Sequence, residues 1–235
     1  MFHEIVKRAT TNATTQFQKL GYVSTNLVNY STPAYKVKDF ELFLDEAGRI
    51  KGTLRGDASK GAIELSKNPL DVAIDGPGYF VVTKHDGSTA YTRDGRFIVN
   101  ARGYLSTLTG EIIGSGIKVP VNYFKLYFEP DGTVNIKIKE EDDKRAIGKL
   151  NIVNFPSPGN LKDAGKNLVV PTEASGSPQT VENPSYIKQY ATETSNMNFF
   201  ETMSQILRTN SSFISSMKLV KYTDQIYRQS INLRQ

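Results

Sequence analysis

The sequence predicts an α+β fold, in which long N- and C-terminal helices pair as a coiled coil and flank a central antiparallel β-rich domain. Three observations support this prediction. Apolar residues recur at alternating intervals of four and three near both ends of the 235-residue chain. In the middle, glycine-containing turn signals separate strand-like runs about every 8–12 residues. Strands and helices do not alternate there, which disfavours a parallel sheet.

The first helix is expected within residues 1–35. Its apolar line continues to Tyr30 with one interruption at Gln16, and Pro33 is expected to stop the helix because proline lacks a backbone donor. A narrow line of this kind is typical of a helix that packs on another helix. The predicted assembly interface on this helix comprises Phe2, Val6, Ala9, Ala13, Leu20, Val23 and Leu27.

The second helix, with a lead-in, is expected within residues 186–235. Asn198 followed by Glu201 matches a capping box, and Asn210 and Asp224 interrupt the apolar line. A helical hairpin lying on the central domain is the alternative, but a narrow line fits helix-on-helix packing better than packing on a sheet. The predicted assembly interface on this helix comprises Phe199, Met203, Ile206, Phe213, Met217, Val220 and Tyr227.

Between the helices, residues 36–68 predict a linker or extended segment and residues 69–185 a β domain. Within that domain, "DVAIDGPGYFVV" crowds two glycines and a proline between apolar runs. A phosphate-binding loop needs a helix behind it, but "YFVV" is strand-like. We therefore expect "DGPG" to reverse the chain between two strands, with Pro77 and Gly78 central to a type II turn and Gly78 at positive φ.

The composition disfavours a catalytic or metal site. The chain has no cysteine and only two histidines, His3 and His85, which excludes thiolate metal sites and disfavours other metal centres. Asp71 and Asp75 are the best carboxylate pair, but four residues of extended strand separate them by about 13 Å, beyond either glycosidase geometry. We predict no catalytic residues, no cofactor and no metal.

The net charge of +5 is unevenly placed, at +4 over residues 1–38, +3 over residues 186–235 and −2 between them. This pattern disfavours a nucleic-acid binder. The polar faces of the helices carry mostly Thr, Ser, Asn and Gln, whereas a membrane-surface helix carries Lys and Arg there. There is no run of 18 apolar residues and no secretory signal pattern, so no stable membrane insertion is expected. The alternatives left open are an enzyme using Asp71 and Asp75, and a β module that binds membranes through basic helices.

Four stretches, taken in order, resemble the signatures of bacterial flagellar rod and hook proteins. "STNLVNYSTPAYK" closes the first helix, "DVAIDGPGYF" and "AYTRDGRF" lie in the β region, and "ETSNMNFFETMSQIL" opens the second helix. Ala34 stands where that family usually has glycine, and the last helix lacks the family's "QRAYE"-like stretch. The residues that carry the resemblance are Asn26, Leu27, Asn29, Thr32, Tyr35, Asp71, Gly76, Gly78, Tyr91, Thr92, Arg93, Gly95, Ser195 and Asn196.

The resemblance implies a structural axial subunit of the flagellar basal-body rod, with the proximal rod favoured over the distal rod. Such a subunit polymerises helically and transmits motor torque toward the hook. Its expected partners are copies of itself, other rod and hook proteins and the flagellar export apparatus. It is expected to be exported without a cleaved signal peptide and to lie in the periplasm.

Overall fold

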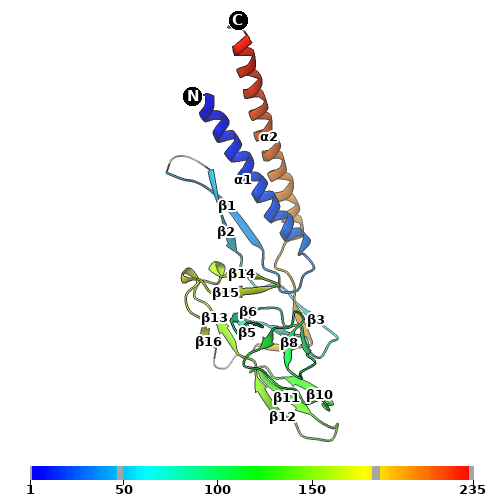
Figure 1. The fold of residues 1–235 in the computed structure, drawn as a ribbon. Helices are drawn as coiled ribbons and strands as arrows, with labels where there is room; N and C mark the ends of the chain where they lie inside the picture. Colours follow the sequence, from blue (N-terminus) through cyan, green and yellow to red (C-terminus); the bar gives the residue numbers. More distant parts are fainter. Residues whose placement is uncertain (1, 47–49, 182–185, 233–235) are drawn as a thin grey trace. The chain divides into compact units, whose positions relative to one another are not determined.

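A computed structural model describes residues 2–46, 50–181 and 186–232. The chain forms two compact units, one from residues 1–30, 37–57 and 197–235 and the other from residues 31–36 and 58–196. The first unit holds both long helices, and the second is built from antiparallel strands (Figure 1). The prediction of an α+β fold with a β-rich antiparallel middle is confirmed.

In the first unit, helix α1 (Phe2–Val28) lies along helix α2 (Phe199–Asn232). The rings of Phe17 and Phe213 have centroids 5.9 Å apart, and those of Tyr30 and Phe199 lie 5.7 Å apart. Early residues of one helix therefore face late residues of the other, so the helices are antiparallel. Helix α2 begins where predicted, because the Asn198 side chain accepts the Glu201 backbone N–H at 3.2 Å.

Helix α1 ends at Val28, before the predicted stop at Pro33. The last turn tightens there, since the Asn29 backbone N–H donates to the carbonyls of both Thr25 and Asn26, at 3.2 and 3.1 Å. Shared donors of this kind are common where a helix ends. Proline thus follows the end of the helix without causing it.

A β-hairpin packs beside α1 in the same unit. Strand β1 (Lys38–Leu44) pairs with β2 (Ile50–Gly56), from Lys38↔Gly56 to Leu44↔Ile50. The Asn26 side chain fixes its start, donating to the Lys38 carbonyl at 3.0 Å and accepting the Lys38 N–H at 3.1 Å. The Phe40 ring stacks on Tyr22 of α1 at 5.2 Å. Both strands lie in the segment 36–68, for which the sequence predicted a linker or extended segment.

In the second unit, one sheet of nine strands dominates, in the order β14-β15-β6-β5-β9-β8-β7, with β13 joining β5 and β16 joining β13. A three-stranded sheet β10-β11-β12 and two pairs, β4-β17 and β3-β18, complete it. The strands are β3 Ile63–Leu65, β4 Val72–Ile74, β5 Tyr79–Thr83, β6 Thr89–Thr92, β7 Phe97–Val99, β8 Leu105–Thr107, β9 Ile112–Ile113, β10 Lys125–Phe128, β11 Thr133–Lys137, β12 Arg145–Lys149, β13 Ile152–Asn154, β14 Lys162–Gly165, β15 Leu168–Val170, β16 Gln179–Thr180, β17 Ile187–Gln189 and β18 Ala191–Glu193, with short 3₁₀ turns at Pro158–Asn160 and Glu173–Ser175.

The core of this unit is a single apolar cluster drawn from the large sheet, the three-stranded sheet and β4-β17. Phe80 and Phe97 pack edge to face at its centre, with ring centroids 5.2 Å apart. A smaller aromatic cluster places Tyr79 and Tyr91 against Phe155. Both clusters come from strands with apolar residues at alternate positions, as expected for half-buried sheets.

The "DGPG" segment is not the turn of a hairpin, which corrects the sequence prediction. Strand β4 before it pairs with β17, whereas β5 after it pairs with β6, β9 and β13. The segment therefore carries the chain from one sheet to another instead of reversing it. The prediction of positive φ at Gly78 is confirmed, since φ is 120° there.

We expect Gly78→Ala to lower the free energy of unfolding by roughly 1 kcal/mol or more, because alanine is disfavoured at positive φ. The added Cβ would also lie 2.6 Å from Ile152 Cγ2 and 3.1 Å from the Val153 carbonyl oxygen. Gly76→Ala avoids the positive-φ cost, but its Cβ would lie 2.6–2.8 Å from three atoms of the Tyr186 ring, which would have to shift although its hydroxyl donates to the Pro77 carbonyl. Urea denaturation of both variants measures the order.

Gly87→Ala is the matched control, because Gly87 has φ of 79° but nothing within 4 Å of an added Cβ. It isolates the cost of the backbone conformation from the cost of the clash. A Gly78→Ala loss no larger than that of Gly87→Ala would contradict the packing argument.

Candidate functional site

The face of α2 that contacts α1 is lined by small hydroxyl side chains. Thr202, Thr209, Ser216 and Thr223 are all buried, and successive members are seven residues apart. Ser216 accepts a hydrogen bond from the Asn12 side chain of α1 at 2.8 Å. Residues seven apart lie on one helix face. Small side chains on that face allow the two helices to approach closely.

Within the chain, the predicted interface residues of α1 are largely buried, whereas several of those on α2 are exposed. On α1, Ala9, Ala13 and Val23 are buried, and Val6, Leu20 and Leu27 are half-buried; the side chain of Phe2 lies outside the described part. On α2, Ile206, Phe213 and Val220 are half-buried, but Phe199, Met203, Met217 and Tyr227 are exposed. The line of α2 that contacts α1 is thus displaced by one residue from the predicted one.

The displacement leaves large apolar side chains of α2 facing away from α1. We call Phe200, Met203, Leu207, Ile214 and Met217 the outer stripe. Their spacing of three, four, seven and three residues places them along one side of the helix. Leu207 is 62% exposed and Met217 is 48% exposed. An exposed apolar stripe of this kind marks an interaction surface.

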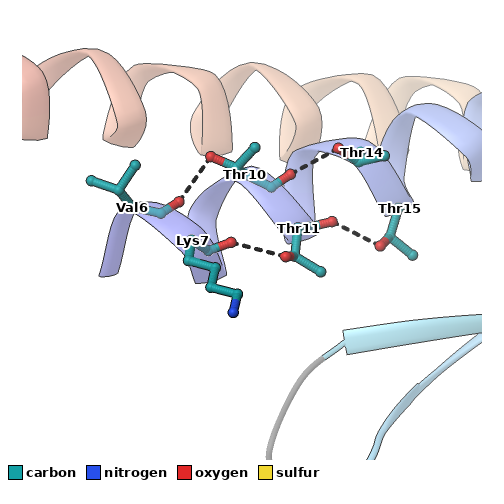
Figure 2. Close-up of a pocket in the computed structure, with 6 residues that line it drawn as sticks. All are labelled: Val6, Lys7, Thr10, Thr11, Thr14 and Thr15. Carbon is teal, nitrogen blue, oxygen red and sulfur yellow. Dashed lines mark hydrogen bonds between the residues drawn. The ribbon is translucent and has the colours of Figure 1, made fainter. Parts of the chain in front are cut away.

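A shallow hollow of about 410 Å³ lies on α1, lined by Val6, Lys7, Thr10, Thr11, Thr14 and Thr15. Figure 2 shows that each threonine hydroxyl donates to the carbonyl four residues earlier in the helix. The distances run from 2.8 Å for Thr10 to Val6 to 3.0 Å for Thr14 to Thr10. Because each hydroxyl has only one proton, the threonines have no donor left for a ligand, and the Lys7 ammonium is the remaining side-chain donor of this lining.

In the β unit, family-motif residues lie around the buried side chain of Arg93. Arg93 Nε donates to Glu193 Oε2 at 2.7 Å. The same guanidinium donates to the carbonyls of Ile74, Gly76 and Gly78, at 2.7–2.9 Å. The "TRDG" motif thus holds the "DGPG" backbone. Sequence reasoning missed Glu193, although an acid two residues before the "SN" of "ETSN" was the available signal.

The remaining motif residues support the same region. Ser66 and Asn68 donate to the buried Asp71 carboxylate, at 2.5 and 2.8 Å. A Cβ on Gly95 would lie 1.6 Å from the Val72 carbonyl oxygen, so only glycine fits there.

The other motif residues have structural positions. Buried among them are Tyr91 and Thr92 of β6 and Tyr35, while Leu27, Asn29, Thr32 and Ser195 are half-buried. Asn196 donates a hydrogen bond to Ser59, and Asn26 holds the hairpin of the first unit.

The two candidate catalytic carboxylates have separate structural partners. Asp75 pairs with Lys60 and Lys188, each at 2.5 Å, and hydrogen bonds from Lys188 and Lys60 lower the pKa of Asp75 to about 2. Asp71 instead accepts from its own loop. Burial, with a smaller contribution from Asp163, raises the pKa of Tyr35 to about 12, so its phenol stays protonated. In the described ranges, no cluster of three metal-ligating side chains occurs.

Residues 73–136 match the family model described as the flagellar hook protein FlgE/F/G D1 domain. The flagellar basal-body rod protein FlgG of Buchnera aphidicola subsp. Baizongia pistaciae is 33% identical over 181 residues, which span 75% of this chain and 70% of that protein. The chain belongs to the family of flagellar basal-body rod proteins. It is a structural subunit of the basal body, since this family is structural and not enzymatic.

Two further relatives span nearly the whole chain. The basal-body rod protein FlgG of Agrobacterium fabrum is 28% identical over 93% of this chain and 94% of its own length. The basal-body rod protein FlgF of Mesorhizobium japonicum is 23% identical over 88% of this chain and 87% of its own length. The similarity therefore includes the terminal helices as well as the β unit. None of the described helices is long and apolar enough to cross a bilayer.

The departure at Ala34 has a measurable consequence. Ala34 is buried with φ of 58°, a conformation that glycine enters without a Cβ clash, which explains the glycine usual in this family. We expect Ala34→Gly to raise the free energy of unfolding by up to about 1 kcal/mol, after the entropic cost of glycine is subtracted from the relieved strain. Thermal melts measure the change. Ala62→Gly, at a position without positive φ, is the control and should not stabilise; equal shifts would contradict the strain at Ala34.

Proposed function

We propose that the chain is an axial subunit that polymerises helically through its terminal helices and transmits motor torque toward the hook. The outer stripe of α2 is the observation that supports this most strongly. α1 occupies the small-residue face of α2, and the large apolar side chains of the outer stripe stay between 36% and 82% exposed. Burying each such side chain is worth about 1.5–3 kcal/mol, which a neighbouring subunit would supply.

The α1–α2 pair is proposed to act as one coiled-coil unit in the assembly. The small-residue heptad supports this, because its four positions, three heptads apart from first to last, keep the same face of α2 toward α1. The hydroxyls of Ser216 and Thr223 donate to their own helix, at 3.0 and 2.7 Å. Their methylene and methyl groups are thus available to pack against α1, and the contact between the two helices needs few charged groups.

The partners proposed are further copies of this chain, other rod and hook proteins, and the flagellar export apparatus. Export without a cleaved signal peptide and a periplasmic site follow from the same family resemblance. The proximal rod, favoured over the distal rod by the sequence, stays a prediction. The predicted division into residues 1–35, 36–68, 69–185 and 186–235 also stays a prediction.

Met217→Asp tests the outer stripe. An isolated aspartate among packed apolar side chains costs several kcal/mol, so this variant is expected to stay monomeric at concentrations where the wild type forms filaments. Its own stability should change by no more than about 0.5 kcal/mol, because Met217 is exposed within the chain. Sedimentation velocity and urea denaturation give the two readings.

Ser215→Asp is the matched control, since Ser215 is exposed on α2 and lies off both the outer stripe and the small-residue line. It introduces the same charge at the neighbouring position and should leave polymerisation intact. Filaments of normal length from Met217→Asp would contradict the proposal, as would an equal loss in both variants.

A further inference from the structure

Among the described residues of the β unit, the carboxylate of Glu193 is fully buried, with its side chain 0% exposed. It accepts three hydrogen bonds, from Arg93 Nε at 2.7 Å, Lys36 Nζ at 2.6 Å and the Gly61 backbone N–H at 2.9 Å. A buried carboxylate is tolerated only when it is paired and hydrogen-bonded in this way. We call Glu193, Arg93, Lys36 and Gly61 the Glu193 cluster.

Arg93 of the cluster donates hydrogen bonds both to Glu193 and to the backbone. Besides Glu193, it donates to three backbone carbonyls of residues 74–78, so its planar guanidinium has little freedom to turn. The Ile74 carbonyl is the last of β4, which pairs with β17, and the other two carbonyls follow that strand. The Glu193 cluster is thereby anchored to the sheet core of the same unit.

The cluster also gathers the segments through which the chain enters and leaves the β unit. The chain passes between its two units after residues 30, 36, 57 and 196. Lys36 and Gly61 lie one and four residues from such crossings, and Glu193 lies three residues before the last. Each point at which the chain passes between the units therefore lies within a few residues of a segment that contacts the Glu193 cluster.

Backbone hydrogen bonds join these segments to one another. The Ala34 N–H donates to the Glu193 carbonyl at 2.7 Å, and the Thr194 N–H donates to the Ala62 carbonyl at 2.8 Å. The Asn196 side chain donates to Ser59 Oγ at 3.0 Å. Three stretches far apart in sequence, 34–36, 59–62 and 193–196, therefore form one hydrogen-bonded bundle around the Glu193 carboxylate.

We propose that the Glu193 cluster is the mechanical joint of the subunit, which takes up force carried along the chain between the two units before that force reaches the β core. The proposal rests on the torque-transmitting function proposed above. Charge-assisted hydrogen bonds are short and directional, so they resist displacement over a small distance, whereas apolar contacts allow neighbouring segments to slide. A buried ion pair adds little net stability compared with an apolar replacement, which leaves positioning as its contribution.

Single-molecule pulling tests the joint without any assembly, so its outcome is independent of whether the chain polymerises. Because the chain has no cysteine, Ser31→Cys and Phe200→Cys give unique handles at two exposed positions. The wild type is expected to show a separate rupture of the entry segments before the β core unfolds. Glu193→Gln, which removes the charge and keeps the shape, should lose this first event and keep the second.

Hydrogen exchange gives a second readout. In Glu193→Gln, the backbone N–H groups of Ala34, Gly61 and Thr194 should exchange roughly ten- to a hundredfold faster, the range expected when a charge-assisted hydrogen bond is lost. Core strands β5 and β6 should keep their protection. Glu129→Gln is the matched control, since Glu129 pairs with Lys144 at 2.7 Å at the ends of β10 and β12, where both side chains are partly exposed.

If Glu193→Gln does not fold, Lys36→Met decides the question, because it keeps the Arg93–Glu193 pair and removes the cation that donates to both Glu193 and the Ser59 carbonyl. It should weaken the first rupture and speed exchange at Ala34, while the Gly61 N–H keeps its hydrogen bond to Glu193. An unchanged first rupture in the folded variants would overturn the joint. So would equal loss of protection across all strands, which indicates ordinary stabilisation of the fold.

Discussion

The pairing of α2 with α1 through small side chains is the constraint on which the account of this chain depends. A threonine or serine at every seventh position brings the two helices together without using the large apolar residues of α2. Those residues are then directed away from α1 along a separate line. One helix thus carries two faces, with small residues for its own chain and large residues for another surface. A helix with only one apolar face could bury that face against its partner helix, and the chain could then remain a monomer.

The β unit follows a different principle, because its motif residues act through the backbone. Arg93 holds three carbonyls of the "DGPG" region, Gly95 admits a carbonyl where any Cβ would clash, and Gly78 takes a positive φ. A sequence motif of glycines, one arginine and one glutamate at fixed spacings can resemble a catalytic motif. Here the hydrogen bonds and backbone conformations of these residues fix the course of the chain.

The sequence predicted the elements that depend on local patterns. The two helices, the Asn198 cap and the positive φ of Gly78 follow from periodicity, capping and the restriction that proline imposes. Local patterns do not predict which strands pair, so the sequence predicts a hairpin turn at "DGPG" although β4 and β5 belong to different sheets. The line of α2 that contacts α1 consists of Thr202, Thr209, Ser216 and Thr223, and a pattern of apolar residues does not contain it. Glu193 and Arg93 meet across 100 residues, a pairing that no local signal contains.

The central claim is that the outer stripe of α2 is free in the monomer and covered in the polymer. Labelling of Ile214→Cys with a maleimide, in a chain that otherwise has no cysteine, measures this directly. The account predicts rapid labelling in the monomer and strong protection once filaments have formed, while Ser215→Cys on the adjoining face is protected far less. Equal labelling of Ile214→Cys in monomer and filament would contradict it.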